Sequence, residues 1–291
     1  MENIIDIKKI QREKPISELL RFSIINIDKP SGQTSFQVSQ FVKEALGLNK
    51  TSHFGTLDPA VSGVLPVALG RACRLNEYFM HRDKEYVGIM RLHSDVSDEI
   101  LQREIKKFIG KIKQIPPVRS RVKRAERIRE VKKFEILERE GKDVLFLAEV
   151  QAGTYIRKLC DDLGKEIGGG HMLELRRIKA GVFEEKESIN LYELEKAVDE
   201  YKKGNGKLLR EILIPGEKVC EILQSVQVKK ETIRKLLTGS PIFLSFIEDT
   251  EEIKRLQENE KICAFNESRF IGCYRVIRKG DLIGAPEFVF N

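Results

Sequence analysis

The sequence predicts an α/β (α+β) protein in which a large mixed domain precedes a small β-rich module. Up to about residue 215, short apolar runs typical of strands alternate with amphipathic helical patterns. Beyond Pro215-Gly216 the pattern changes to several short strands between turn signals. The 291 residues are enough for one large core and a smaller second one. Residues 1–20 show no clear period, so we expect an N-terminal extension there, followed by domains over 21–215 and 216–291.

The first elements follow from an apolar run and from helix-capping residues. Residues 22–27 predict a strand, and Asp28-Lys-Pro-Ser-Gly32 predicts the turn that ends it. An amphipathic helix follows, for which Thr34 or Ser35 can serve as the N-cap. Gly47 marks the end of this helix, because glycine readily adopts the left-handed conformation that closes a helix.

Periodicity and turn signals predict the remaining elements. Before residue 215 they are an apolar element over 64–69, a strand over 86–92, a helix over 98–110 after Ser97, paired strands over 134–138 and 144–151, and a helix over 156–167 that Gly168-Gly-Gly170 ends. After residue 215 they are a helix over 231–237 and strands over 242–247, 261–265, 270–277 and 282–289. The acidic run over 248–260 is expected to form an exposed loop or a short helix.

The charge of the chain is positive and unevenly distributed. The formal net charge is +7 and the sequence pI is about 9.0. Residues 111–133 hold ten lysines and arginines against two glutamates. A basic segment of this density suits a polyanion such as nucleic acid, although a solvated, charge-rich strand or helix would look the same.

The motif content excludes several function classes. Five cysteines without a Cys-x-x-Cys spacing argue against a zinc site or a disulfide framework and favour a reducing interior. No apolar stretch is long enough to span a membrane, so we expect a soluble, cytoplasmic protein. The four histidines lack metal-ligand spacing, and no phosphate-binding glycine loop is present. No cofactor and no metal are therefore expected.

Asp58 lies in the most distinctive stretch of the chain, a nearly uncharged loop that begins at Thr51 and contains only one other ionisable side chain, His53. Pro59 fixes its own φ and moves Asp58 out of the helical region. Because Asp-Pro is a common turn opener, the loop taken alone favours a hydrogen-bonded turn aspartate over a nucleophile. The rest of the chain reverses that order.

Arg157 stands at the start of the helix predicted over 156–167. If Thr154 caps this helix, the guanidinium group falls in the first turn, where the helix macrodipole favours anions by about 0.3–1 kcal/mol. An exposed arginine can occupy such a position by chance. The placement is better explained if the side chain reaches a carboxylate across a cleft, and Asp58 is the obvious candidate.

Tyr86 is open to two interpretations. The segment Lys84-Glu-Tyr-Val87, taken alone, favours a half-buried strand tyrosine. The alternative is a stacking platform for a nucleobase, which is worth roughly 1–3 kcal/mol per base.

Four motifs resemble those of the TruB family of pseudouridine synthases, in that family's order and at about its spacing. They are Asp28-Lys-Pro-Ser-Gly-Gln-Thr-Ser35, Gly55-Thr-Leu-Asp-Pro-Ala-Val-Ser-Gly-Val-Leu-Pro66, Lys84-Glu-Tyr86 and Gly153-Thr-Tyr-Ile-Arg157. Residues 114–124 and 171–177 extend the resemblance, which covers about residues 22–190. Within the family the chain looks most similar to the archaeal dyskerin-type enzymes, which carry a C-terminal PUA domain.

The resemblance implies a pseudouridine synthase fold over 21–215, with a mixed, largely antiparallel central sheet flanked by helices. A small β-barrel-like PUA domain that binds RNA would follow over 216–291. In the site, the resemblance makes Asp58 the catalytic nucleophile, Arg157 its salt-bridge partner and Tyr86 the aromatic ring that stacks on the target uracil. Substrate-binding positions are implied for Lys29, which with Pro30 would buttress the active-site loop, for Leu175 in the apolar wall, and for His53, Arg119, Lys123 and Arg124.

The implied function is an RNA pseudouridine synthase that isomerises uridine in rRNA or tRNA. The implied form is the catalytic subunit of a guide-RNA box H/ACA ribonucleoprotein, with guide RNA and small accessory proteins as partners and no membrane partner. A stand-alone enzyme for the T-loop of tRNA is the first alternative, and a non-catalytic RNA-binding scaffold is the second. Ser52 and Phe54 depart from the family pattern, which usually has smaller residues there.

Overall fold

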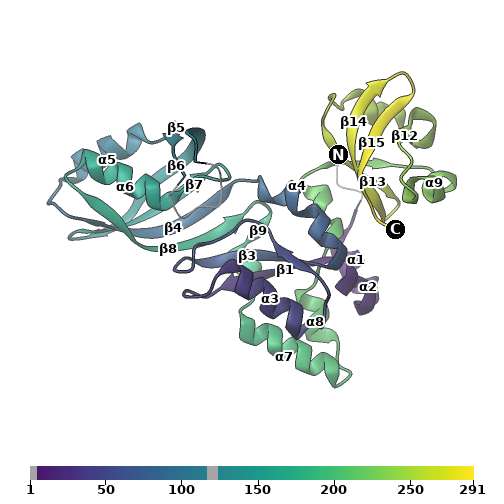
Figure 1. The fold of residues 1–291 in the computed structure, drawn as a ribbon, viewed down its shortest axis with the longest axis horizontal. Helices are drawn as coiled ribbons and strands as arrows, with labels where there is room; N and C mark the ends of the chain where they lie inside the picture. The colour runs from purple at the N-terminus through teal and green to yellow at the C-terminus, as the bar shows by residue number, and fades with distance from the viewer. Residues whose placement is uncertain (1–4, 117–123) are drawn as a thin grey trace.

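The structure, a computed structural model, describes residues 5–116 and 124–291 (Figure 1). Within these residues the strands form a large sheet of ten strands and a small sheet of five. Figure 1 shows the small sheet at one end of the molecule, and α5 (Asp98–Lys107) with α6 (Ile156–Glu166) at the other. The predicted α+β architecture with a small C-terminal β module is confirmed.

The large sheet is mixed and mostly antiparallel, as predicted. Its strands lie in the order β10-β1-β3-β8-β4-β7-β6-β5, with β2 beside β3 and β9 beside β8. Within this sheet, β3 and β8 are the only pair of described strands that run parallel. The strands are β1 (Ser23–Lys29), β2 (Thr51–His53), β3 (Ser62–Leu69), β4 (Lys84–Leu92), β5 (Gly110–Gln114), β6 (Arg127–Glu140), β7 (Asp143–Val150), β8 (Gly170–Ala180), β9 (Phe183–Glu184) and β10 (Ile214–Pro215).

Helices flank the large sheet, and local signals set where several of them begin. Thr34 caps α3 in a capping box with Gln37, and Ser97 caps α5, both as predicted. Alternating burial along β4 and β7 places one face of the sheet on the core. The remaining helices are α1 (Ile7–Glu13), α2 (Ile16–Arg21), α3 (Ser35–Ala45), α4 (Asn76–Met80), α7 (Leu191–Lys202), α8 (Lys207–Ile212), α9 (Ile233–Leu237) and α10 (Thr250–Lys254).

Several elements differ from the sequence predictions. Residues 1–20 contain α1 and α2, which are too short to show a helical period and are stabilised by contacts with distant segments. The side-chain amide of Gln11, for example, donates to three backbone carbonyls at the end of α8. The basic segment extends β6 toward its N-terminus, so much of it is strand. The strand predicted over 242–247 contains only β12 (Ile242–Phe243).

The small sheet lies in the order β11-β13-β14-β15-β12. No sequence pattern predicted β11 (Gln224–Gln227), a four-residue strand that pairs in parallel with β13. Its other strands are β13 (Lys261–Asn266), β14 (Arg269–Lys279) and β15 (Leu282–Val289). In the acidic run, α10 forms the predicted short helix, but Ile253 and Leu256 are buried against the small sheet's core.

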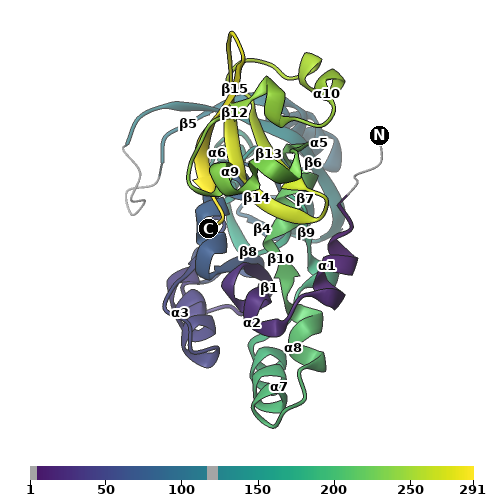
Figure 2. The same ribbon diagram turned by 90° about the vertical axis from the view of Figure 1, so that its right-hand side faces the viewer.

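The two sheets share an apolar cluster, and Figure 2 shows the small sheet in front of the large one. Phe22, at the start of β1, stacks on Phe270 of β14 with ring centroids 5.1 Å apart. Arg71 donates a 2.9 Å hydrogen bond to the backbone oxygen of Val289. The C-terminal module therefore stabilises the first one as well as itself. No helix of the described residues is long and apolar enough to cross a membrane.

Candidate active site

The loop that carries Asp58 joins β2 to β3 and is held by backbone hydrogen bonds. The Asp58 carbonyl accepts from the Val61 amide at 3.0 Å, so the backbone forms the turn that Asp-Pro predicts. Ser35 of α3 bonds both backbone groups of Leu57 through its hydroxyl, at 2.8 and 3.1 Å. This turn uses the backbone of Asp58 and not its carboxylate. Asp58 can therefore be both a turn residue and a nucleophile.

Lys29 supports the same loop from β1. Its side chain is fully buried, and its ammonium group donates to the carbonyls of Pro30, Gln33 and Pro59 at 2.8, 2.6 and 3.0 Å. All three ammonium hydrogens are thereby used. Burial lowers the pKa of Lys29, while the charge of Asp58 acts in the opposite direction.

The structure brings Asp58 and Arg157 together. Nη2 of Arg157 lies 2.6 Å from Oδ2 of Asp58, and the two side chains are 49% and 55% exposed. Thr154 is not the cap of α6, because its hydroxyl donates to the Gln151 carbonyl. The N-cap is Tyr155. Its backbone amide donates to the side-chain oxygen of Gln114 at 3.0 Å, and the side-chain nitrogen of Gln114 donates to its carbonyl at 3.2 Å.

Arg177 is a site residue that the sequence analysis did not single out. It is 1% exposed and donates to the carbonyls of Val64 at 2.8 Å and Gly55 at 3.0 Å. Burial lowers the pKa of Arg177, and the neighbouring Tyr86 opposes this through its charge and a hydrogen bond. The only sequence signal was its place at the end of the 171–177 motif.

Gly63 allows the close approach of β3 to β8 behind the loop. Its φ is +99°, and a Cβ atom there would lie 2.2 Å from the carbonyl oxygen of Arg177. Any other residue would push the two strands apart. The register that this glycine permits places Gly63 opposite Arg177 on one side and Tyr86 opposite Arg177 on the other.

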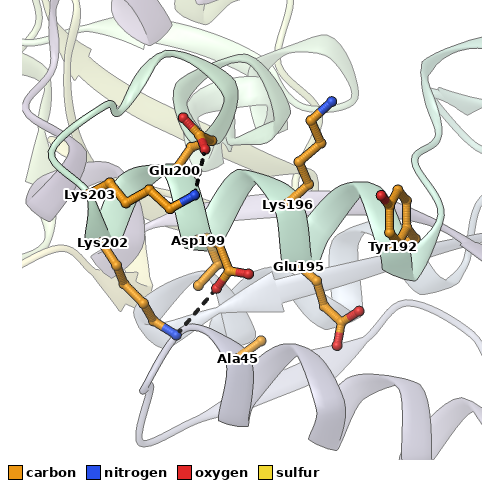
Figure 3. A pocket seen from close by; sticks show the side chains of 9 residues that line it. Ala45, Tyr192, Glu195, Lys196, Asp199, Glu200, Lys202 and Lys203 are labelled. Atoms are coloured by element: carbon orange, nitrogen blue, oxygen red, sulfur yellow. Dashed lines mark hydrogen bonds and ion pairs between the residues drawn. The ribbon is translucent and has the colours of Figure 1, made fainter.

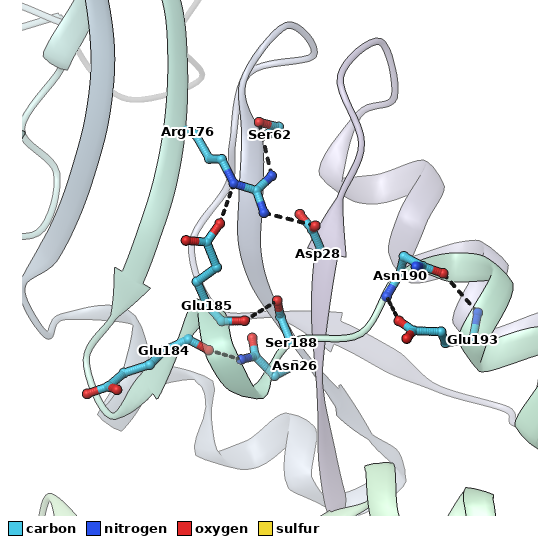
Figure 4. Close-up of polar contacts among 9 residues, drawn as sticks. All are labelled: Asn26, Asp28, Ser62, Arg176, Glu184, Glu185, Ser188, Asn190 and Glu193. Atoms are coloured by element: carbon cyan, nitrogen blue, oxygen red, sulfur yellow. Dashed lines mark hydrogen bonds and ion pairs between the residues drawn. The ribbon is translucent and has the colours of Figure 1, made fainter. Parts of the chain in front are cut away.

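Arg176 ties the same strands together on the other face (Figure 4). Its guanidinium group donates to Asp28 of β1 at 2.9 Å and also forms an ion pair with Glu185. A weaker contact of 3.4 Å reaches the hydroxyl of Ser62, where β3 begins. Because Ser62 directly follows the Asp58 turn, this brace fixes the exit of the loop.

The other predicted residues fall into two groups. Tyr86 and Leu175 are 9% and 8% exposed and belong to the core cluster that also contains Leu57 and Val61. His53 contacts the Thr56 hydroxyl at 3.2 Å, and burial lowers its pKa.

The basic-segment residues lie elsewhere. Arg124 is exposed before β6, while Arg119 and Lys123 lie outside the described residues. His171 pairs with His93 at 2.8 Å toward the end of β8 opposite the loop. Phe54 is explained by packing, because it stacks on Phe79 at 4.9 Å. No group of three metal-ligating side chains occurs in the described part of the chain.

Comparisons with known proteins identify the family of this chain. The family model for the N-terminal domain of TruB family pseudouridylate synthases matches residues 43–156, and that for the tRNA pseudouridylate synthase B C-terminal domain matches residues 157–221. The probable tRNA pseudouridine synthase B of Methanocaldococcus jannaschii is 44% identical over 234 residues, which cover 80% of this chain and 70% of that protein. The corresponding protein of Methanopyrus kandleri is 41% identical over 255 residues, covering 87% and 75%.

Solved structures are similar over nearly the whole chain. A crystal structure of a Cbf5-Nop10-Gar1 complex contains a chain that is 35% identical, with a TM-score of 0.88 and coverage of 97% of this chain and 88% of that one. A structure of an H/ACA ribonucleoprotein bound to a substrate RNA containing 2′-deoxyuridine matches with 33% identity, a TM-score of 0.86 and coverage of 97% and 89%. This chain belongs to the TruB family of pseudouridine synthases, which isomerise uridine in RNA.

Proposed function

We propose that Asp58 is the catalytic nucleophile of this RNA pseudouridine synthase and that Arg157 holds its carboxylate ionised and oriented. The 2.6 Å ion pair between them is the observation that carries the proposal. Uracil must detach from its ribose, turn and rejoin through carbon, which requires a reactive group at a surface that a nucleotide can reach. Both side chains are about half exposed, so the pair is open to such a nucleotide.

Tyr86 and Leu175 would form the wall against which the target base lies. A uridine must leave its stack to reach the site, which costs a few kcal/mol, and contact with an aromatic ring recovers part of that cost. Only a small part of the Tyr86 ring is open, since the side chain is 9% exposed. We therefore propose that Tyr86 meets the base with one edge while Arg177 holds the ring in place from below.

We propose further that the enzyme acts as the catalytic subunit of a guide-RNA box H/ACA particle with small accessory proteins. Support comes from the similarity to Cbf5 chains in complexes with Nop10 and Gar1 over 97% of this chain. Residues 21–215 would form the catalytic domain and residues 216–291 a PUA-like RNA-binding domain. The basic segment over 111–133, with Arg119, Lys123 and Arg124, would hold phosphates.

A stand-alone tRNA enzyme is the second candidate, because archaeal relatives that are 41–44% identical carry the name probable tRNA pseudouridine synthase B. The two candidates differ in one test. Purified protein is incubated with tritiated tRNA alone and, separately, with an assembled guide particle and its target RNA. Product only with the particle supports the guide-dependent form, and equal product on bare tRNA supports the stand-alone form.

The five cysteines are all free thiols, which suits a reducing compartment such as the cytoplasm.

Asp58→Asn tests the role of the carboxylate. This variant keeps the shape of the side chain but loses the charge and the nucleophile, so product formation should be abolished while RNA affinity changes by no more than a few-fold. Asp143→Asn is a matched control, because Asp143 also pairs with an arginine at 2.6 Å. Near-normal turnover of Asp58→Asn, or equal loss in Asp143→Asn, would reject the assignment.

A further inference from the structure

A groove of about 480 Å³ opens beside the Asp58 loop, and nothing described so far explains it. Residues of α3 and α4 provide two of its walls. His53 and Thr56, which shortly precede Asp58 in the sequence, form part of a third wall of the groove. The side chains that give the groove its character are Phe36, Gln40, Lys43, Lys50, His53 and Asn76. The volume is in the range of small-molecule sites and is sufficient for one nucleotide.

The groove is basic and has an exposed aromatic side chain. Phe36 is 70% exposed on the first turn of α3, where packing gives no reason for a phenylalanine. Lys43 and Lys50 form no ion pair within residues 5–116 and 124–291, and no carboxylate lines the groove. Free cations and an open aromatic ring are the groups that an RNA strand requires.

A second groove on the same protein shows that this combination is not general. It measures about 450 Å³, lies along α7 and has its own exposed aromatic residue, Tyr192 (Figure 3). Two of its lysines are neutralised, because Lys202 lies 3.8 Å from Asp199 and Lys203 lies 3.0 Å from Glu200. Two grooves of similar size therefore differ in charge, and only the one beside the Asp58 loop is suited to a polyanion.

We propose that the groove beside the Asp58 loop binds a nucleotide of the RNA strand next to the target uridine, with its base stacked on Phe36 and its phosphates held by Lys43 and Lys50. The inference rests on the proposed function, since it places a neighbour of the nucleotide that Asp58 attacks. Burial and the charge of Arg177 lower the pKa of His53, so this imidazole is neutral at pH 7 and faces base or ribose instead of phosphate. The groove thus sets the register in which the strand enters the site.

Binding of a fluorescein-labelled tRNA transcript to the full-length protein, measured by fluorescence anisotropy at several salt concentrations, tests the proposal. Phe36→Ala should raise Kd at least about fivefold, because loss of one base–aromatic stack costs about that much or more. The double variant Lys43→Ala/Lys50→Ala should reduce the slope of log K against log salt by about 1.4–1.8, since each phosphate contact contributes about 0.7–0.9.

The groove along α7 supplies matched controls. Tyr192→Ala and the double variant Lys202→Ala/Lys203→Ala should leave Kd within about twofold, and the salt slope within about 0.3, of the parent values. Unchanged binding in Phe36→Ala and in the Lys43/Lys50 variant, or equal loss in the controls, would overturn the proposal. A different outcome would be that the parent protein forms no pseudouridine while Phe36→Ala still weakens RNA binding. That result would support RNA binding in the groove and reject the proposed function.

Discussion

Replacing Arg157 by methionine separates the structural role of the ion pair with Asp58 from its catalytic role. Methionine keeps much of the apolar stem but removes the charge. The two groups lie 2.6 Å apart and are 49% and 55% exposed, so water screens their attraction in the free protein. Exposed pairs contribute about 0.2–1 kcal/mol. Arg157→Met should therefore lower the free energy of unfolding by no more than about 1 kcal/mol, and the melting midpoint by no more than about 4 °C.

The same substitution should slow isomerisation far more. At 2.6 Å the Coulomb attraction is about 1.6 kcal/mol at the dielectric constant of water and about 6 kcal/mol at an effective value of about 20. RNA that covers the loop excludes water from the ion pair. The effective dielectric constant around the pair then falls, and the attraction becomes stronger. Removal of one electrostatic group that is aimed at the reacting centre typically costs about 10²–10³ in rate. We expect the single-turnover rate of Arg157→Met to fall by about that factor.

The assay follows tritium released from carbon 5 of labelled uridines under single-turnover conditions, with urea unfolding measured in parallel. Arg91→Met is the matched control, because Arg91 is also 49% exposed and lies 2.6 Å from Asp143. It should show the same small loss of stability and no more than about a twofold change in rate. The electrostatic role of Arg157 is refuted if Arg157→Met remains folded and turns over within tenfold of the parent, or if Arg91→Met slows the reaction equally.

Two further predictions concern the frame of the site. In urea unfolding, Gly63→Ala should destabilise the protein more than Gly32→Ala. Both glycines have φ near +100°, a conformation that costs about 1–3 kcal/mol for alanine. Of the two, only Gly63 would place the new Cβ atom 2.2 Å from a backbone oxygen. Equal losses would show that the strands can separate freely. Burial lowers the pKa of Lys84 to about 8 from an ordinary 10.5. The unfolded chain thus binds more protons between these pH values, and the stability of the parent relative to Lys84→Met should rise by up to about 3 kcal/mol from pH 8 to 10.5. A difference that stays constant with pH would contradict this burial effect.

Much of the fold could be predicted because its signals are local. The capping pair of Thr34 and Gln37, the cap at Ser97 and the apolar alternation of β4 all lie within a few residues of the element they specify. The misses have the opposite cause. The N-terminus of α6 is fixed by Gln114, which lies 41 positions before Tyr155. β11 exists because β13 lies beside it, and four residues cannot carry a distinctive pattern of their own.

The candidate site divides in the same way. Asp58 and Arg157 could be paired from the sequence because each stands in an unusual local setting, a nearly uncharged loop and the first turn of a helix. Arg177 could not be found, since a charged residue in a strand is expected to face solvent. Its burial is decided by the register of β8 between β3 and β4, which Gly63 permits and which no local pattern specifies.

The buried cations beneath the loop explain how a loop with almost no charge of its own can be held so firmly. Lys29, Lys84 and Arg177 are each at most 5% exposed. Lys29 and Arg177 donate to the loop carbonyls of Pro59 and Gly55, and Lys84 donates to the carbonyl of Met80 outside the loop. Within residues 5–116 and 124–291, none of the three forms an ion pair. Carbonyl dipoles solvate a cation without cancelling its charge, so a positive field remains below the surface where RNA would lie. A buried carboxylate partner would remove that field and compete with Asp58 for nearby cations, which gives a physical reason for using carbonyls alone.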